Sequence, residues 1–352
     1  MKPKALFLYT EIAEYFLSGI EALNKKETEI HIVKWATNKE APFDFRNLNG
    51  VHFYERNLYS NAELAVLVKN INPSIIIVSG WIDKGYLKSL TAFKNKIPVV
   101  LSLDNHWTAS LKQKLAALIS PFFLKNKFSH AWVPGKTQKQ YALKLGFKEN
   151  KIHQGFYSAD TSLFSGYHQK SRAQKQKNYP KKLLYVGRYI KEKAIPLLWE
   201  SFIELQTEIP NNWELICVGT GELFEKRIHH PKIKHLGFIQ PAEMDKIIAE
   251  TGVFVLPSNF EPWGVVVHEY AAAGFPIICS DKIGAATTFL ENGKNGFSFQ
   301  SDNKEDLKKA LKKTMSLSTE KLIEMGELSH KKSQQLSPEK WANTVLKILN
   351  SN

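Results

Sequence analysis

The stretch VFVLPSNFEPWGVVVHEYAAAGFPIICSD, from Val253 to Asp281, decides the fold of this 352-residue chain. An apolar strand over Val253–Pro257 leads into a short loop, and a helix then runs as far as Gly274 before a second apolar strand begins. A strand, a loop, a helix and another strand in this order predict a parallel sheet with crossover helices. Such sheets bind ligands at the carboxyl ends of their strands, which is where this loop lies.

Two glutamates stand in this stretch with seven residues between them, the pattern E-x7-E. Glu261 lies in the loop, and Glu269 lies about a turn and a half into the helix. The start of the helix presents backbone N–H groups that can bind a phosphate. The spacing alone fits an exposed loop acid and an ordinary helix-surface acid equally well, so a functional interpretation needs support from the rest of the chain.

The charge, the cysteines and the apolar runs of the chain limit its possible partners and its cellular compartment. The chain has 48 Lys and Arg against 34 Asp and Glu, a net charge of +14, which favours nucleotides, nucleic acid or phospholipid headgroups as partners, or else a Lys-rich solvated surface. Cys217 and Cys279 lie in apolar strand patterns, so we expect buried thiols in a reducing compartment. The apolar run near the N-terminus is too short for a signal peptide, and none reaches the roughly 18 residues of a membrane span. We therefore expect a cytoplasmic protein.

Strands and helices alternate along the chain, which predicts an α/β fold of two Rossmann-like, doubly wound parallel-sheet domains facing across a cleft. We expect an N-terminal domain over 1–165, a basic linker over 166–182, a C-terminal domain over 183–335, and a helix over 336–352 that packs back on the first domain. The linker is expected because that segment is Lys-rich with almost no apolar periodicity. The expected strands are Ala5–Tyr9, Ile30–Trp35, Ile75–Ser79, Val99–Leu103, Ala131–Val133, Leu183–Val186, Glu214–Val218, Ile233–Leu236, Val253–Leu256 and Ile277–Cys279.

Two cations follow the first strand of the second half. Gly187 ends that strand and permits a tight turn, Arg188 follows it, and Lys193 comes after four more residues. Arginine offers a planar fork to phosphate oxygens and lysine a compact charge, so the pair suits a diphosphate. Two solvated loop cations would give the same pattern.

Glycines and an aromatic residue follow the next two strands. Gly219 and Gly221 stand in Val218-Gly219-Thr220-Gly221, where the third glycine of a dinucleotide fingerprint is absent, so we interpret them as a turn that a ligand approaches closely. Phe238 would form one wall of a nucleobase slot, although a core aromatic is the more common role.

In the first half, Asp104, Asn105 and His106 follow a strand and would supply a base, a donor or a sugar-binding group, although a lone histidine is usually structural. The segment 110–127 mixes lysines with Leu, Ile and Phe and suits an anionic membrane surface. Pro121 argues against one continuous helix there, and a buried helix with basic ends is the alternative. No C-x-x-C, H-E-x-x-H or D-x-D spacing occurs, so no metal site is expected.

Together these segments resemble retaining glycosyltransferases of the GT-B fold, in the GT4 group, also called glycosyl transferases group 1. The resemblance is strongest over Leu183–Gly296. Val186-Gly187-Arg188 with Lys193 resembles the family's diphosphate loop, and Val218–Gly221 its V-G-x-G turn. Glu261-Pro262-Trp263-Gly264 with Glu269 resembles its E-x7-E motif almost residue for residue.

The resemblance implies roles for these residues. Arg188 and Lys193 would neutralise the donor diphosphate, Glu269 would hydrogen-bond the ribose, and Glu261 would contact the transferred sugar. The donor site would also include Gly187, Gly219, Gly221, Phe238, Gly264 and the N–H groups of Val265 and Val266. Two cations and a helix N-terminus would carry the charge, so the resemblance implies neither a metal nor another cofactor. His106 lies where the family often has a functional histidine, and Asp104 competes with it.

One departure concerns the residue after Lys193, which is Ala194 where the family usually has glycine. We expect alanine to be tolerated there provided that its backbone φ is negative.

These observations predict a hexosyltransferase that moves a sugar from a nucleoside-diphosphate donor, of UDP or GDP type, to a hydroxyl acceptor with retention of configuration. Family habit and the basic charge suggest a glycan or glycolipid acceptor in surface polysaccharide or glycolipid assembly, with peripheral contact to an anionic membrane and no nucleic acid partner. A sugar-nucleotide 2-epimerase of the same fold is the alternative. A non-enzymatic basic protein that binds nucleic acid or a membrane is a more distant one.

Overall fold

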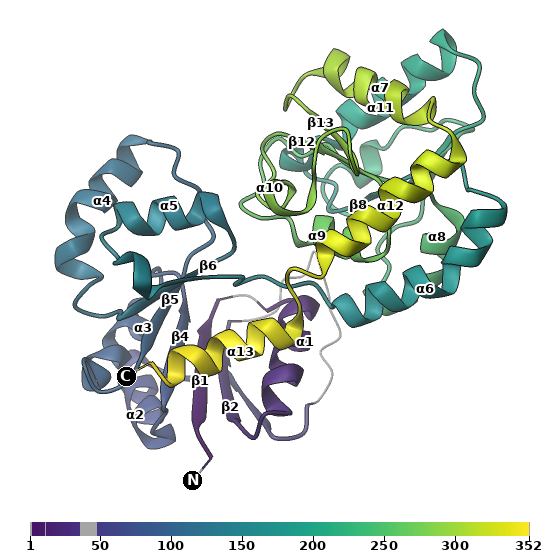
Figure 1. Cartoon of the computed structure of the whole chain (residues 1–352). Coiled ribbons are helices and arrows are strands. Elements are labelled where there is room, and N and C mark those ends of the chain that lie inside the picture. Colours follow the sequence, from purple (N-terminus) through teal and green to yellow (C-terminus); the bar gives the residue numbers. More distant parts are fainter. Residues whose placement is uncertain (1, 11, 36–47, 352) are drawn as a thin grey trace. The chain divides into compact units, whose positions relative to one another are not determined.

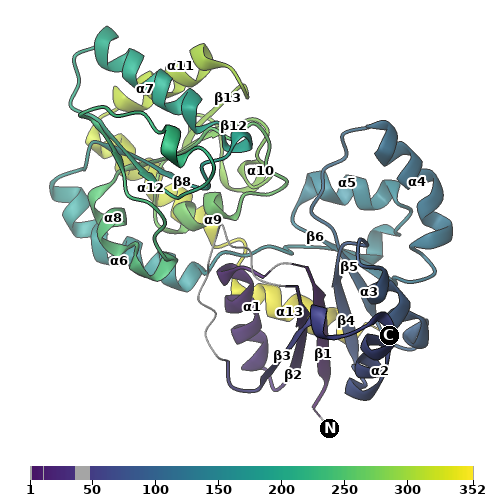
Figure 2. The ribbon, with the colours of Figure 1, turned by 180° about the vertical axis from the view of Figure 1, so that it is seen from behind.

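The computed structural model describes residues 2–10, 12–35 and 48–351. They form two compact units, each built on a parallel sheet with covering helices (Figures 1 and 2). One unit comprises Met1–Ser158 and Leu336–Asn352, and the other comprises Ala159–Gln335. Two doubly wound α/β units are therefore present, as expected. No helix in the described ranges has the length and apolarity that crossing a membrane requires.

The N-terminal unit is built on a seven-stranded sheet in the order β3-β2-β1-β4-β5-β6-β7. Its strands are β1 (Lys4–Tyr9), β2 (Glu29–Lys34), β3 (Val51–Glu55), β4 (Ile75–Ser79), β5 (Val99–Ser102), β6 (His130–Val133) and β7 (Ile152–Gln154). Its helices are α1 (Glu14–Asn24), α2 (Asn61–Ile71), α3 (Lys84–Ser89), α4 (Leu111–Phe123), α5 (Lys136–Lys144) and α13 (Pro338–Leu349). The expected strands of this half are confirmed to within one residue at each end, and β3 and β7 were not foreseen.

The last helix of the chain packs into this N-terminal unit, where α13 lies beside α1 in both ribbon views (Figures 1 and 2). A methyl group added at Gly19 would come 2.9 Å from the Trp341 ring, so the two helices are in close contact. Trp341 is buried and donates a hydrogen bond from its indole to the Phe156 carbonyl at 2.9 Å. The C-terminal helix thus completes the core that the first strands of the chain begin.

The C-terminal unit is built on a six-stranded parallel sheet in the order β10-β9-β8-β11-β12-β13. Its strands are β8 (Lys182–Val186), β9 (Glu214–Val218), β10 (Ile233–His235), β11 (Val253–Leu256), β12 (Ile277–Ser280) and β13 (Gly296–Phe299). Its helices are α6 (Thr161–Lys177), α7 (Ile195–Glu208), α8 (Asp245–Glu250), α9 (Val265–Ala272), α10 (Ala286–Phe289), α11 (Lys304–Met315) and α12 (Thr319–Ser333). The order of the strands reverses between β8 and β11, which is where an open α/β sheet binds its ligand.

The expected linker over 166–182 is wrong, because most of it belongs to helix α6. Asp160 caps this helix by accepting a hydrogen bond from the Leu163 amide at 3.0 Å. Its buried face includes Tyr167, Ser171 and Lys175, which recur every four residues. Because two of these three buried residues are a serine and a lysine, the pattern of apolar residues does not reveal the helix. Lys175 is buried, and its ammonium lies 3.9 Å from the centre of the Phe275 ring.

Helix α4 is continuous, so the expectation that Pro121 interrupts it is also wrong. Proline lacks the amide that would bond the Ala117 carbonyl one turn earlier. The Ser120 hydroxyl lies 3.1 Å from that carbonyl oxygen and replaces the lost partner. Pro121 also stands in the last turn of the helix, where little helix remains to be disturbed.

Candidate active site

The loops that follow β8, β9, β10 and β11 are joined by backbone hydrogen bonds at one edge of the C-terminal sheet. The Gly187 amide donates to the Val218 carbonyl at 3.0 Å, and the Gly219 amide donates to the Gly237 carbonyl at 2.7 Å. The Asn259 amide donates to the Glu192 carbonyl at 2.8 Å and so links the β11 loop to the β8 loop. This framework holds every expected donor-site residue of the C-terminal unit except those on α9.

The loop after β8 carries the two expected cations. Arg188 is exposed directly after Gly187, and its carbonyl accepts a hydrogen bond from the buried Tyr185 hydroxyl at 2.8 Å. A single 3-10 turn, Lys191–Lys193, follows, and it brings Lys193 to the neighbouring β11 loop.

Ala194 adopts a left-handed conformation with φ +48°, so the condition under which alanine was expected to be tolerated, a negative φ, is not met. The 3-10 turn ends there, and the N–H of Ala194 bonds the Lys191 carbonyl at 3.1 Å as the chain reverses into α7. A left-handed conformation costs an L-residue about 1–2 kcal/mol relative to glycine. This cost explains why glycine is usual at this position. In this chain, Ala194 adopts the left-handed conformation in spite of its side chain.

We predict that Ala194→Gly raises the free energy of unfolding by up to about 1 kcal/mol, because relief of the strain exceeds the cost of a more flexible unfolded chain. Ala194→Val, which adds a β-branched side chain at the same φ, should lower it. Urea unfolding of the two variants measures both changes. A glycine variant less stable than the valine variant would contradict the assigned backbone conformation.

The glycine turn after β9 is required by the protein's own backbone. Gly219 has φ +135°, and a methyl group there would come 1.9 Å from the Gly187 carbonyl oxygen. Gly221 has φ +147°, and a methyl group there would come 2.8 Å from the Tyr189 carbonyl oxygen. The two glycines thus let the β9 loop pack directly on the β8 loop, which the sequence interpretation had attributed to a ligand.

Glu261 lies at the point where the sheet order reverses. Its carboxylate is mostly buried, forms an ion pair with Lys193, and accepts a hydrogen bond from the Ser258 hydroxyl at 2.9 Å. Ser258 is itself fixed, because its carbonyl accepts a hydrogen bond from the Ser280 hydroxyl at 2.5 Å. The pair between Lys193 and Glu261 joins the β8 loop to the β11 loop. Ser258 also belongs to this site through its hydrogen bond to Glu261, a role that its residue type alone does not indicate.

Helix α9 begins next to this network. Gly264, with φ +86°, precedes Val265 and Val266, and no side chain caps the helix. The first amides of an uncapped helix carry partial positive charge and suit an anion. The expected phosphate-binding amides are therefore at a helix N-terminus, as predicted from the sequence.

Glu269 lies one turn further along α9 and is half-buried. Burial, reinforced by the nearby Asp160 carboxylate, raises the pKa of Glu269 to about 7. The charge of Glu269 therefore changes with pH near neutrality, whereas an ordinary surface glutamate is ionised throughout that range.

Phe238 is half-buried in the loop after the edge strand β10. It follows Gly237, whose carbonyl bonds the glycine turn after β9. The structure thus places the expected base-slot residue at the same sheet edge as the cations.

Asp104 and His106 belong to the N-terminal unit, in the segment that follows β5. Asp104 accepts a hydrogen bond from the Tyr157 hydroxyl at 3.1 Å, and the His106 carbonyl accepts one from the Gln113 side chain at 2.5 Å. Both residues lie beyond the carboxyl end of a strand, as expected, and Tyr157 is a contact that the sequence pattern did not reveal.

Comparison with known proteins identifies the C-terminal half. The model of the family Glycosyl transferases group 1 matches residues 168–332. Residues 168–332 are a group 1 glycosyltransferase domain. The enzyme class that the motifs predict, a glycosyltransferase, is confirmed for this domain, and the non-enzymatic alternative is not.

Two relatives match this chain over very different lengths. The alpha-monoglucosyldiacylglycerol synthase of Acholeplasma laidlawii is 26% identical over 328 residues, 84% of this chain and 78% of that enzyme. The glycogen synthase of Mycobacterium tuberculosis is 30% identical over 133 residues, 36% of this chain and 32% of that enzyme. The second match thus spans about a third of its relative's length.

Solved structures confirm the GT-B architecture of the whole chain. Anabaena HepE in complex with UDP and glucose superimposes with a TM-score of 0.74 at 16% identity, covering 99% of this chain and 100% of that one. An Escherichia coli structure with UDP-2-fluoro glucose, described as trehalose-6-phosphate, superimposes with a TM-score of 0.74 at 11% identity and covers 99% of both chains. At these identities the likeness concerns the fold.

Proposed function

We propose that this protein transfers a sugar from a nucleoside-diphosphate donor to a hydroxyl acceptor, with retention of anomeric configuration and without a metal ion. The observation that carries the proposal is the pair of Lys193 and Glu261, which joins a cation suited to phosphate and an acid suited to sugar hydroxyls at the reversal point of the sheet. The solved neighbours bound to UDP and a UDP-sugar support a uridine donor.

In the proposed reaction, the bond between the anomeric carbon and the diphosphate oxygen breaks, and a bond from that carbon to the acceptor oxygen forms on the same face. The leaving diphosphate takes the electron pair of the broken bond, and the acceptor hydroxyl passes its proton to an oxygen of that diphosphate. Arg188 and Lys193 stabilise the charge that develops on the diphosphate. The N–H groups of Val265 and Val266 add the partial charge of a helix N-terminus. Asp104 and His106 are the candidates from the N-terminal unit for contact with the reacting sugar.

The proposal predicts that chelation by EDTA leaves turnover unchanged. Two side-chain cations and helix amides supply the positive charge that a divalent ion would otherwise bring to the diphosphate. The measurement is donor consumption before and after EDTA treatment, with added Mn²⁺ as a third condition. Loss of activity on chelation with recovery on Mn²⁺ would contradict a metal-free mechanism.

The alternative of a sugar-nucleotide 2-epimerase uses the same donor site but needs no acceptor. Product analysis with donor alone separates the two activities. Transfer predicts at most slow hydrolysis of the donor, whereas an epimerase converts the nucleotide sugar to its epimer without any acceptor.

The division of roles between the two glutamates gives a further prediction, for Glu269→Gln. If Glu269 binds the ribose as a carboxylate, the variant should bind donor at least about tenfold more weakly at pH 8, a loss of about 1.4 kcal/mol. Donor affinity of the native protein should rise between pH 6 and pH 8 as the group with its pKa of about 7 loses its proton.

The contribution of Glu269 to the stability of the native protein should fall as pH rises, opposite to the expected rise in donor affinity. A raised carboxyl pKa stabilises the fold below the unfolded pKa, and this contribution is lost as pH rises through the folded pKa. The advantage of Glu269→Gln in melting temperature should therefore grow from pH 5 to pH 8. Unchanged donor affinity in this variant would show that Glu269 does not hold the nucleotide.

Helix α4 of the N-terminal unit exposes an apolar surface. Of the thirteen large hydrophobic side chains exposed in the described ranges, six belong to this one helix. They are Leu111, Leu115, Leu118, Ile119, Phe122 and Phe123. The expected alternative of a buried helix is therefore wrong.

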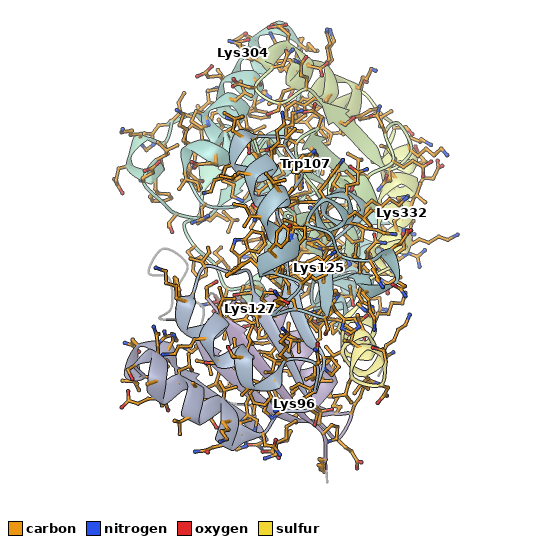
Figure 3. All side chains as sticks on the ribbon, turned by 90° about the vertical axis from the view of Figure 1, so that its left-hand side faces the viewer. Lys96, Trp107, Lys125, Lys127, Lys304 and Lys332 are labelled. Atoms are coloured by element: carbon orange, nitrogen blue, oxygen red, sulfur yellow. The ribbon has the colours of Figure 1, made fainter. Side chains whose placement is uncertain are left out.

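Lysines surround this apolar surface. Lys112 and Lys114 flank the apolar stripe on either side at helical spacing, and both are exposed. Lys125 and Lys127 follow the end of the helix (Figure 3). An apolar helix face bordered by lysines is complementary to a bilayer with anionic headgroups, which accepts the apolar side chains and attracts the cations.

We propose that α4 binds the surface of an anionic membrane and so brings the enzyme to a lipid-linked acceptor. The related alpha-monoglucosyldiacylglycerol synthase, matched over most of this chain, supports a glycolipid acceptor. Co-sedimentation with vesicles of phosphatidylcholine alone or with phosphatidylglycerol tests the proposal. The protein should sediment with the anionic vesicles and be released by salt.

Leu118→Glu with Phe122→Glu should abolish this binding, whereas Val66→Glu, which changes an exposed apolar residue of α2 in the same unit, should not. Absence of binding to anionic vesicles would overturn the membrane proposal and leave the transfer reaction untouched.

A further inference from the structure

Two histidines and a glutamate lie close together on the N-terminal sheet, apart from the residues assigned to the transfer reaction. Glu29 and His31 alternate along β2 and so point to the same face of the sheet. His52 lies directly opposite His31 on the edge strand β3 in the parallel register. The three side chains offer two imidazoles and one carboxylate whose ligand atoms all lie within 4.8 Å of one another. Within the described ranges, no other group of three such residues is this close.

The contacts within this cluster orient the histidines. His31 is buried, and its Nδ1 lies 3.1 Å from the Tyr54 hydroxyl while its Nε2 lies 2.9 Å from Glu29 Oε1. The rings of His31 and His52 stack with their centres 4.7 Å apart. A hydrogen-bond partner at the ring nitrogen that binds no metal fixes the orientation of a metal-bound histidine, and the Tyr54 hydroxyl at Nδ1 can act in this way while Nε2 faces Glu29.

We propose that Glu29, His31 and His52 bind a divalent cation of the zinc class. Imidazole and carboxylate are ligands that suit Zn²⁺, and three protein ligands leave one position for water. Two ligands alternate on one strand and the third comes from the strand beside it, so backbone hydrogen bonds already fix their spacing. The bound ion would join the edge strand β3 to β2.

Lys4 is the competitor for this position. Its ammonium lies 3.4 Å from Glu29 Oε1, and about a third of each side chain is exposed, so the lysine can leave through solvent. The cation and the ammonium both need the Glu29 carboxylate, so a bound metal displaces Lys4.

The cluster is separate from the site proposed for the transfer reaction. Glu29 is the first residue of β2 and His52 the second of β3, so the cluster lies toward the amino-terminal ends of the strands. Ligands of parallel α/β sheets bind at the opposite, carboxyl ends. The inference therefore does not depend on the proposed function, and its failure would leave that function standing.

Thermal unfolding of the untagged, EDTA-treated and desalted protein, with and without Zn²⁺, tests the proposal. Zinc should raise the melting temperature of the native protein, because a ligand that binds only the folded state stabilises it. Co²⁺ should bind in place of Zn²⁺ and give the visible absorption bands that are typical of a cobalt ion with a low coordination number. Isothermal titration with Zn²⁺ supplies the affinity.

Three variants make the test specific. His52→Ala removes an exposed ligand and should weaken zinc binding by about tenfold or more without changing turnover. Lys4→Ala should strengthen binding, because it removes the competing ammonium. His153→Ala is the control, because it breaks a second histidine pair in the same sheet, where Lys151 lies 3.2 Å from His130. No zinc-induced stabilisation of the native protein, or an equal one in His52→Ala, would overturn the site.

Discussion

Lys193→Ala is expected to lower turnover by about 10²–10³-fold, the loss that follows removal of one group that stabilises charge in a transition state. Lys193 is the cation that the structure brings beside Glu261, and its side chain is only 16% exposed, so water cannot fully replace its charge. Arg188→Ala should also lose most of the activity, because we propose that its guanidinium binds the same diphosphate as Lys193. Steady-state donor consumption measures both effects.

Lys191→Ala is the matched control, since it removes an exposed lysine from the same 3-10 turn. It should retain nearly native turnover. Circular dichroism must show that the variants are folded, because Lys193→Ala leaves the mostly buried Glu261 carboxylate without its ion-pair partner. Native rates in both Lys193→Ala and Arg188→Ala would refute the diphosphate assignment.

Gly219→Ala is expected to destabilise the C-terminal unit by about 3 kcal/mol or more. The added methyl group would come 1.9 Å from the Gly187 carbonyl oxygen, and the residue would be held at φ +135°. Backbone strain of this kind costs about 1–3 kcal/mol, and the clash adds to it because both loops are tied by backbone hydrogen bonds. The β8 loop would have to move, so donor binding should fall as well.

Gly237→Ala provides the comparison. Gly237 also has a positive φ, +72°, but a methyl group there would meet no atom within 4 Å. This variant should lose only about 1–2 kcal/mol, the cost of a left-handed conformation. Urea unfolding of the two variants separates the close approach of the loops from backbone conformation alone. Equal stabilities would show that the loops are not packed as described.

Much of the C-terminal sheet was predictable, because three of its four central strands, β8, β9 and β11, are largely apolar runs followed directly by glycine or proline. Strands β9 and β11 have the predicted bounds. The edge strands β3 and β13 were missed, since Val51–Glu55 mixes polar and apolar residues and Gly296–Phe299 begins with glycine. An edge strand has one partner and needs less apolar sequence than a central one, so composition identifies it poorly.

The site residues were predictable in kind but not in their contacts. The loops that carry Lys193 and Glu261 are 68 residues apart in the sequence, and only the order of strands, with β8 beside β11, brings them together. The left-handed Ala194 could not be predicted, because alanine rarely adopts that conformation. The cluster of Glu29, His31 and His52 was missed for a related reason, as the register of β3 against β2 supplies its third member.

A nucleotide-sugar donor site between β8 and β11 is tested most directly by equilibrium binding of nucleoside diphosphates. UDP, GDP and ADP are titrated into the native protein and into Lys193→Ala by isothermal titration in the presence of EDTA. We expect one of these nucleotides to bind the native protein in a 1:1 complex. Lys193→Ala should weaken this binding at least about tenfold, or 1.4 kcal/mol, and Lys191→Ala should not. Failure of all three to bind, or equal affinity in Lys193→Ala, would contradict a donor site between β8 and β11.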